Sequence, residues 1–196
     1  DAFIITDLGL ISLVKKYLPG VEVHASTQLN IANLSSIDWA IENGFQRAVI
    51  AREKDYKFLE KASEKDIELE AFVHGALCYA VSGQCLMSSL IGERSGNRGT
   101  CAQPCRKMYD VYSDGKLLSE KIYAISEYDL NTLDSIDKLV GYVNSLKIEG
   151  RMKNPSYVYL ITKLYKDKIL GIENTHRPDE VFNRGFTKGH ILKDGM

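Results

Sequence analysis

The four cysteines of the chain lie within one segment near its middle. Cys78 and Cys85 form a C-x6-C pair, and Cys101 and Cys105 form a C-x3-C pair. A structural zinc site usually takes its thiolates from two tight C-x2-4-C pairs, and only the second pair has that spacing. Iron–sulfur clusters also use four thiolates and accept more varied spacings. The spacing alone therefore leaves open zinc, an iron–sulfur cluster, buried free thiols and disulfides.

Basic and aromatic side chains surround the second cysteine pair. Tyr109 and Tyr112 follow it, and only Glu93 opposes the positive charge of this stretch. Interleaved cations and aromatic rings suit contact with phosphates and stacking on bases, although a solvated charged loop would have the same composition. The candidate RNA-binding residues are Arg94, Arg98, Arg106 and Lys107.

A second group of chemically capable side chains follows the short apolar runs that we expect to be strands. Where parallel strands alternate with helices, their carboxyl ends meet on one face, and active sites lie there. The histidines of this group could bind a catalytic metal together with Glu53 or Glu149, or they could be hydrogen-bonded structural residues. The candidate catalytic residues are His24, His74, Lys147, Glu149 and Arg151.

The elements that must position these residues alternate between strands and helices. Apolar runs predict strands at Phe3–Thr6, Val21–His24, Arg47–Ile50, Leu69–Val73 and Asn144–Ile148. Helical spacing and capping signals predict helices over residues 8–20, 35–44 with a serine cap, 55–65 and 156–171. A hairpin is expected over residues 108–123, turning at Asp114-Gly115.

This alternation predicts an α/β fold with parallel strands, either doubly wound or closed into a barrel. No GxGxxG motif follows a strand, which argues against a dinucleotide-binding sheet. We expect three parts: residues 1–75 as a partial β/α barrel, residues 76–143 as a cysteine-rich insertion with the hairpin, and residues 144–196 as the last barrel strand, a helix and the start of an extension. Five strands cannot close an eight-stranded barrel, so about three are expected upstream.

Composition excludes several classes of protein. The 196 residues are 44% hydrophobic and carry a formal net charge of -1, as in an ordinary globular domain with no overall attraction to nucleic acid or membranes. No apolar run approaches the roughly 18 residues that cross a bilayer, and residues at the start of the sequence lack the basic, apolar and small-residue regions of a signal peptide. The prediction is a cytoplasmic protein without membrane contact, where reduced thiols disfavour disulfides.

Several motifs together resemble one known family. The stretch EAFVHGALCYAVSGQCLMS (residues 70–88) is similar to the signature of the collagenase-like peptidases, unclassified peptidase family thirty-two. Further family-like segments are HASTQLNIAN, AREK, NRGTCAQPCR, SLKIEGRMK and FNRGFTKGH, in this order along the chain. The resemblance therefore covers nearly the whole sequence.

The resemblance implies a TIM-like (β/α)8 barrel, present here from about strand four to strand eight. Relatives include RNA hydroxylases that act on a tRNA wobble uridine or a 23S rRNA cytidine, and proteins that carry a four-iron, four-sulfur cluster. By this analogy the cluster ligands are Cys78, Cys85, Cys101 and Cys105, with Cys105 the least secure because some relatives take the fourth ligand from elsewhere. The family also includes peptidases, so a peptide substrate is the alternative, and a non-catalytic cluster-carrying subunit is a third.

The sequence holds no motif of a known peptidase class, since GxSxG and HExxH are both absent. RNA hydroxylation needs a redox centre, a base pocket and cations for the backbone, and each has candidate residues here. An unpaired barrel edge would make the isolated segment prone to aggregation unless the rest of the protein, a partner or homo-oligomerisation covers it.

Overall fold

The computed structural model describes residues 1–150 and 152–192, and its centre is a seven-stranded sheet. The strands of this sheet are β1 Ala2–Ile5, β2 Glu22–Ala25, β3 Arg47–Val49, β4 Glu68–Ala76, β7 Asp129–Asn131, β8 Ser145–Glu149 and β9 Phe186–Thr187. The α-helices are α1 Leu8–Tyr17, α2 Leu34–Glu42, α3 Tyr56–Ala62, α4 Met87–Gly92, α5 Asp137–Val140 and α6 Pro155–Ile169. Short 3-10 turns are η1 Thr27–Leu29, η2 Pro104–Arg106, η3 Leu133–Ser135 and η4 Pro178–Glu180.

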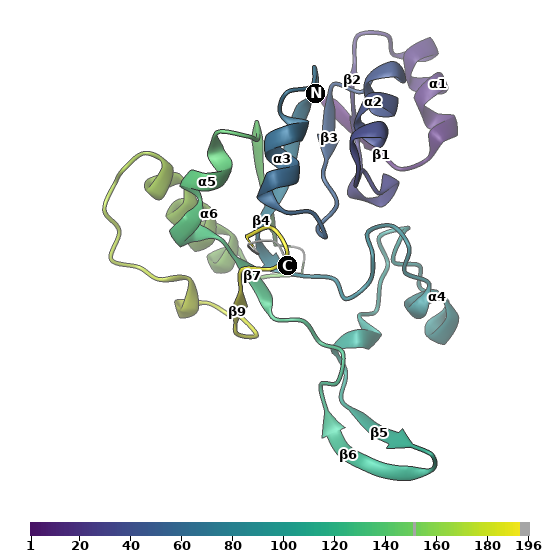
Figure 1. Cartoon of the computed structure of the whole chain (residues 1–196), viewed down its shortest axis with the longest axis vertical. Helices are drawn as coiled ribbons and strands as arrows, with labels where there is room; N and C mark the ends of the chain where they lie inside the picture. Colours follow the sequence, from purple (N-terminus) through teal and green to yellow (C-terminus); the bar gives the residue numbers. More distant parts are fainter. Residues whose placement is uncertain (151, 193–196) are drawn as a thin grey trace.

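The sheet is mostly parallel, as the sequence predicts. Strands β1, β2, β3 and β4 pair in this order, each parallel to the next, and β8 pairs parallel with β4. The short strand β7 runs antiparallel to the end of β4, and β9 pairs parallel with β7. Figure 1 shows α1, α2 and α3 beside the first three strands, and α5 and α6 beside β4 and β7. The fold is therefore a mixed α/β fold built on parallel strands.

Capping side chains begin the helices that cover the sheet. Asp55 accepts a hydrogen bond from the backbone N–H of Phe58 at the start of α3, and Asn154 caps α6 with Pro155 in the first turn. The predicted serine cap of α2 is wrong, because Asn33 is the N-cap residue. Ser36 completes a capping box with it instead.

The main apolar core lies between the sheet and its helices. On β4, alternate residues Leu69, Ala71 and Val73 are buried in this core. Helix residues such as Ile37 and Ile161 pack in the same cluster and are fully buried. Because successive side chains of a strand point to opposite faces, Glu68 and Glu70 face away from this core.

The segment between β4 and β8 contains all four cysteines and the predicted hairpin. Strands β5 Tyr109–Ser113 and β6 Lys116–Ile122 pair antiparallel around a turn at Asp114 and Gly115, both with positive φ angles of 50° and 76°. Figure 1 shows this hairpin projecting away from the main sheet. No helix in the described part of the chain is long and apolar enough to cross a membrane.

Candidate functional site

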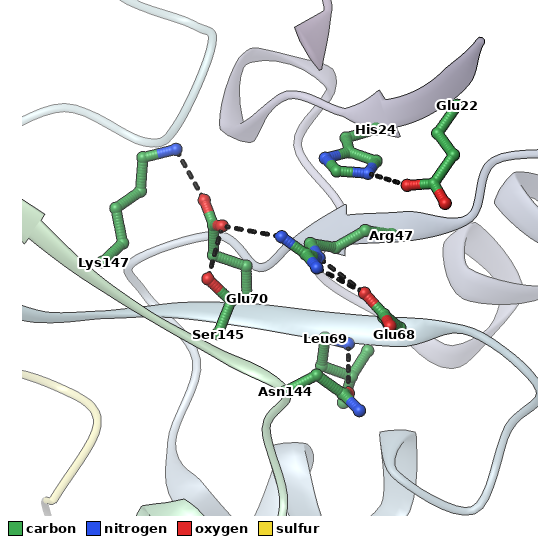
Figure 2. Close-up of polar contacts among 9 residues, drawn as sticks. All are labelled: Glu22, His24, Arg47, Glu68, Leu69, Glu70, Asn144, Ser145 and Lys147. Atoms are coloured by element: carbon green, nitrogen blue, oxygen red, sulfur yellow. Dashed lines mark hydrogen bonds and ion pairs between the residues drawn. The ribbon is translucent and has the colours of Figure 1, made fainter. Parts of the chain in front are cut away.

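Charged and polar side chains lie together on one face of the parallel sheet, here called the charged face (Figure 2). They come from four neighbouring strands, and members from the same strand are two residues apart, which places them on one face. The set is Glu22 and His24 on β2, Arg47 on β3, Glu68 and Glu70 on β4, and Ser145 and Lys147 on β8.

Glu70 is the centre of this group. Its carboxylate accepts hydrogen bonds from Lys147 Nζ at 2.6 Å and from Ser145 Oγ at 2.8 Å, and Arg47 lies 3.8 Å away. Burial alone would raise the pKa of Glu70, whose side chain is 10% exposed. The hydrogen bonds from Lys147 and Ser145 and the charge of Arg47 outweigh burial and lower this pKa, so Glu70 is ionised at neutral pH.

The remaining members of the charged face pair with one another. Arg47 donates from Nε and NH2 to one carboxylate oxygen of Glu68, at 2.8 and 2.5 Å. His24 Nε2 lies 3.3 Å from Glu22 Oε2, and the His24 side chain is 9% exposed. Figure 2 shows His24 on the same side of the sheet as Arg47, without a contact drawn between them. The charged face therefore consists of the group around Glu70 and Arg47 and a separate Glu22–His24 pair, with both signs of charge.

An irregularity in β4 separates His74 from this surface. Phe72 pairs with Lys147 and His74 pairs with Ile148, so β4 has one more residue here than β8. Regular alternation would place His74 on the face of Glu70 and Phe72, but the extra residue turns it to the opposite face.

His74 consequently lies against helix α6. Its Nδ1 is 3.3 Å from the hydroxyl of Tyr165, and the residue is 2% exposed. Burial, with a smaller contribution from the charge of Lys153, lowers the pKa of His74 to about 4 although Asp129 opposes the shift. His74 is therefore neutral at neutral pH, and the structure does not bring it together with His24 or Lys147.

Arg52 connects the charged face to the cysteine segment. Its NH2 donates to Glu149 at 3.2 Å, and its guanidinium stacks 3.8 Å from the ring centroid of Phe72. Burial lowers the pKa of Arg52, and the charges of Glu149, Cys78 and Glu53 act in the opposite direction. The first cysteine is therefore within electrostatic range of the carboxyl ends of β3 and β8.

Glu53 fastens the cysteine segment to the sheet. Its two carboxylate oxygens accept hydrogen bonds from the backbone N–H and the hydroxyl of Ser82, both at 2.8 Å. Gly83 follows with a φ angle of 75°, and a Cβ there would overlap the carbonyl oxygen of Gln28. Sequence reasoning placed Glu53 at a strand end but missed this anchoring role, since its partner is 29 residues away.

The four cysteines are reduced and gather in one neighbourhood. Cys78 is exposed, and the other three are half-buried. Burial raises the pKa of the Cys105 thiol, Arg106 opposes this, and the other three cysteines are close enough to raise it further. Cys101 Sγ accepts a hydrogen bond from the backbone N–H of Gln103 at 3.2 Å, a contact typical of cluster-ligating thiolates.

Four cysteine thiols are the kind of ligand that an iron–sulfur cluster needs, but their sulfur atoms do not form a coordination site in this arrangement. Among the described residues, no three side chains of histidine, cysteine, aspartate or glutamate converge as metal ligands. We therefore assign no coordination geometry to these thiols.

The predicted RNA-binding residues divide into two kinds. Arg94 and Arg98 are exposed, as is Lys107. Arg106 is half-buried, and it donates to the backbone carbonyls of Leu77 and Glu127 at 2.5 Å each. Arg106 thus holds the cysteine segment in place. Arg151, the remaining candidate from the sequence, lies outside the described residues.

The charged face contains a residue that the candidate list lacked. Glu70 is the second residue of the predicted strand Leu69–Val73, where a carboxylate between apolar residues was the available signal. The alternation of Glu68 and Glu70 with Leu69 and Ala71 indicates a polar face, but their partners become visible only once β8 is paired beside β4.

Comparison with known proteins identifies the family. The model of peptidase family U32 matches residues 1–195. The chain belongs to peptidase family U32. No solved structure matches it significantly. The family resemblance inferred from the cysteine motifs is thereby confirmed.

Curated proteins similar to this chain carry different functional names. The chain is 38% identical over 175 residues to tRNA hydroxylation protein P1 of Bacillus subtilis, covering 85% of this chain and 42% of that protein. It is 37% identical over 172 residues to the 23S rRNA 5-hydroxycytidine C2501 synthase of Escherichia coli, covering 86% and 26%. A collagenase of Porphyromonas gingivalis is 38% identical over 214 residues, covering 98% and 59%. The chain spans about half the length of the curated relatives that it matches.

Proposed function

We propose that the protein hydroxylates a base of tRNA or 23S rRNA and depends on an iron–sulfur cluster. The observation that carries the proposal is the similarity to proteins named for tRNA hydroxylation and for 5-hydroxycytidine synthesis. Hydroxylation replaces a ring C–H by C–OH and removes two electrons from the base, so it also requires an oxygen source and an electron acceptor. An RNA substrate would place the protein in the cytoplasm.

In this proposal, Cys78, Cys85, Cys101 and Cys105 hold a four-iron, four-sulfur cluster, with zinc as the alternative occupant. The electrostatic proximity of the other three thiols to Cys105 and the backbone N–H that reaches Cys101 support the assignment. When bound, such a cluster would supply one-electron chemistry. The protein residues position it: Glu53 anchors the segment through Ser82.

We further infer that the parallel strands belong to a TIM-like barrel whose inner surface is the charged face. The sequential parallel order of β1, β2, β3, β4 and β8 supports this, as do helices on the opposite face. In that barrel His24, Lys147, Glu149 and Arg151 would line the substrate pocket. Residues 1–75 and 144–196 would belong to the barrel, and residues 76–143 would form the cysteine-rich insertion.

His74 has a different environment from the other proposed catalytic residues. It is buried against α6, neutral, and within hydrogen-bonding distance of Tyr165. In this proposal His74 acts from the α6 side of the sheet and makes no direct contact with the charged face. The exposed cations Arg94, Arg98 and Lys107 are the candidates for phosphate contacts, and Arg106 contributes positive charge from its half-buried position.

Anaerobic purification of the full-length protein tests the cluster. We expect a brown protein with iron and sulfide in equal amounts, and loss of both in Cys78→Ala and Cys101→Ala. Cys105→Ala distinguishes a fourth protein ligand from an external one, because the cluster should survive in the second case. A colourless anaerobic preparation with stoichiometric zinc would contradict the iron–sulfur assignment.

Nucleoside analysis of RNA from a deletion strain tests the reaction. We expect one hydroxylated nucleoside to disappear and to return when the wild-type gene is restored. Complementation with a Cys101→Ala variant should fail if the reaction depends on the cluster. An unchanged nucleoside profile would remove the RNA hypothesis.

The alternative function is that of a collagenase-like peptidase, supported by relatives named collagenase. In the described part of the chain, no hydrogen bond joins a histidine to a serine or a cysteine, so no activated nucleophile is assembled in this arrangement. Cleavage of denatured collagen by the purified full-length protein, with Lys147→Met and Cys101→Ala as comparisons, would test this alternative directly.

A further inference from the structure

The loop that leads into β9 and the residue before β7 carry two exposed aromatic side chains. Phe182 is 60% exposed and Tyr128 is 62% exposed. Gly185 has a φ angle of 80°, and a Cβ there would lie 3.1 and 3.3 Å from two carbon atoms of the Tyr128 ring. The Tyr128 ring therefore packs directly against the loop that carries Phe182.

Hydrogen bonds hold this loop in one shape. The side chain of Asn183 donates to the carbonyl oxygen of Val181 at 3.0 Å and accepts from the backbone N–H of Gly185 at 3.0 Å. The carbonyl oxygen of Gly185 accepts from the backbone N–H of Asp129 at 2.9 Å, which ties the loop to β7. The loop is therefore ordered before a ligand binds, which lowers the entropic cost of binding.

Two cations lie against the ring of Phe182. Lys153 Nζ is buried and lies 4.1 Å from the ring centroid, and the guanidinium carbon of Arg184 lies 5.1 Å from it. Arg184 also donates from NH1 to Asp129, the neighbour of Tyr128, at 3.3 Å. The Arg184 side chain is 28% exposed, and a guanidinium has five N–H donors, so Arg184 keeps donors for a further group.

The two rings lie near the carboxyl end of β4, where the cysteine segment begins. Asp129 follows Tyr128 directly and pairs with Ala76, the last residue of β4. Cys78 comes two residues after Ala76. The rings are therefore at the same end of the sheet as the proposed cluster ligands.

This combination suits an unpaired stretch of nucleic acid. Every base has a flat π surface that stacks on an aromatic ring, and a neighbouring cation contacts the phosphates of the same strand. A free phosphate would use Arg184 and leave both rings unused. A proline-rich peptide also packs on aromatic rings, but it has no negative charge to pair with the cation. The rings and the cation together therefore favour single-stranded RNA over either alternative.

We propose that Phe182 and Tyr128 form a stacking surface for bases of a single-stranded RNA segment, and that Arg184 contacts a phosphate of that segment. The inference rests on the proposed RNA substrate and adds a site apart from the exposed cations of the cysteine segment. Lys153, buried beside the ring, orients Phe182 and makes no contact with the RNA.

Fluorescence anisotropy of the full-length protein with a labelled ten-nucleotide oligouridylate tests the stacking surface. Phe182→Leu keeps an apolar side chain but removes the ring, so it should weaken binding about tenfold, whereas Phe182→Trp should bind at least as tightly as the wild type. Tyr128→Leu should weaken binding by a similar factor. The matched control Tyr17→Leu removes a 65% exposed ring from α1, which follows the edge strand farthest from β9, and should bind like the wild type.

Salt dependence separates stacking from the phosphate contact. Arg184→Gln should reduce the slope of log Kd against log salt concentration by about 0.7, the change for one lost phosphate contact on a single strand. Phe182→Leu should leave this slope unchanged, and Arg184→Lys, which keeps the charge, should restore it. Melting curves of the same preparations show that each variant is folded.

Four results would overturn the inference. An abasic oligomer that binds as tightly as the oligouridylate would show a site for phosphates alone. Equal binding by Phe182→Leu and the wild type would show that the ring does not touch RNA, as when another part of the chain covers it. An Arg184→Gln slope equal to that of the wild type would remove the phosphate contact. Absence of oligouridylate binding, with binding of a peptide of Pro-Pro-Gly repeats or without it, would remove the RNA site.

The outcomes separate this inference from the proposed reaction. If the oligouridylate binds through Phe182 but a deletion strain keeps all its hydroxylated nucleosides, the stacking surface stands and the hydroxylase function fails. If the deletion removes a hydroxylated nucleoside, and Phe182→Leu both restores it and binds RNA like the wild type, the hydroxylase function stands and the stacking surface fails.

Discussion

Replacement of Lys147 by Met should destabilise the protein through its effect on Glu70. The variant removes the ammonium group that donates to Glu70 Oε1 at 2.6 Å. The carboxylate, 10% exposed, then retains Ser145 at 2.8 Å and the more distant Arg47 at 3.8 Å. A hydrogen bond to a charged group contributes about 1.5–3 kcal/mol. Because the Lys147 side chain is 31% exposed and water can partly replace it, we expect a loss of about 1.5 kcal/mol.

A double-mutant cycle, measured by unfolding in urea, isolates the interaction between Glu70 and Lys147. Glu70→Gln, Lys147→Met and the double variant of the full-length protein should give a coupling free energy of about 1 kcal/mol. Because the folded-state pKa of Glu70 is lowered, its contribution is complete above the ordinary glutamate pKa of about 4.3 and is lost as the pH falls through the lower folded-state value. The cost of Lys147→Met should therefore shrink in acid. A coupling indistinguishable from zero at neutral pH, with all variants folded, would refute this reasoning.

Three further predictions concern stability in urea. Gly83→Ala should lower the free energy of unfolding by about 1–3 kcal/mol, because φ is 75° and the new methyl group would overlap the Gln28 carbonyl oxygen. The control Gly20→Ala meets open space and should change the stability little. Equal effects of the two substitutions would contradict this reasoning. Tyr165→Phe should cost about 1 kcal/mol by removing a hydroxyl that donates to β4 at 2.8 Å, and an unchanged midpoint would argue against that bond. The pKa of His74 is about 4 in the folded state and about 6.5 in the unfolded state, so the unfolded state binds more protons between these values. The free energy of unfolding should therefore fall by up to about 3 kcal/mol from pH 6.5 to pH 4. His74→Gln should not show this loss.

Local patterns predicted most of the elements in this fold. The apolar runs identified β1, β2, β3, β4 and β8 to within a few residues, and Asp114-Gly115 fixed the hairpin, because these signals are contained in the segments themselves. The short strand β7 was missed, since three residues become a strand only by pairing with the end of β4. The cap of α2 was misplaced because several polar residues precede that helix and each is a capable cap.

The candidate site was predictable in its residue types and less so in its grouping. Lys147 and Glu149 were predicted as candidates because they are polar residues at the end of a predicted strand, and the structure places both on β8. Glu70, the centre of the charged face, was missed, since its importance depends on a partner distant in sequence. His74 was grouped with Lys147 because alternation was assumed to continue along β4, and the extra residue there depends on pairing with β8.

That extra residue bears on how homologous sequences are compared. Without Val73, His74 would directly follow Phe72 and would still pair with Ile148, and neighbouring residues of a strand point to opposite faces. The imidazole would therefore stay on the side of α6, and Gly75 would keep its position against the Glu149 backbone, where no side chain fits. A homologue with a one-residue gap at this point would thus have a regular strand with the same side chains on both of its faces.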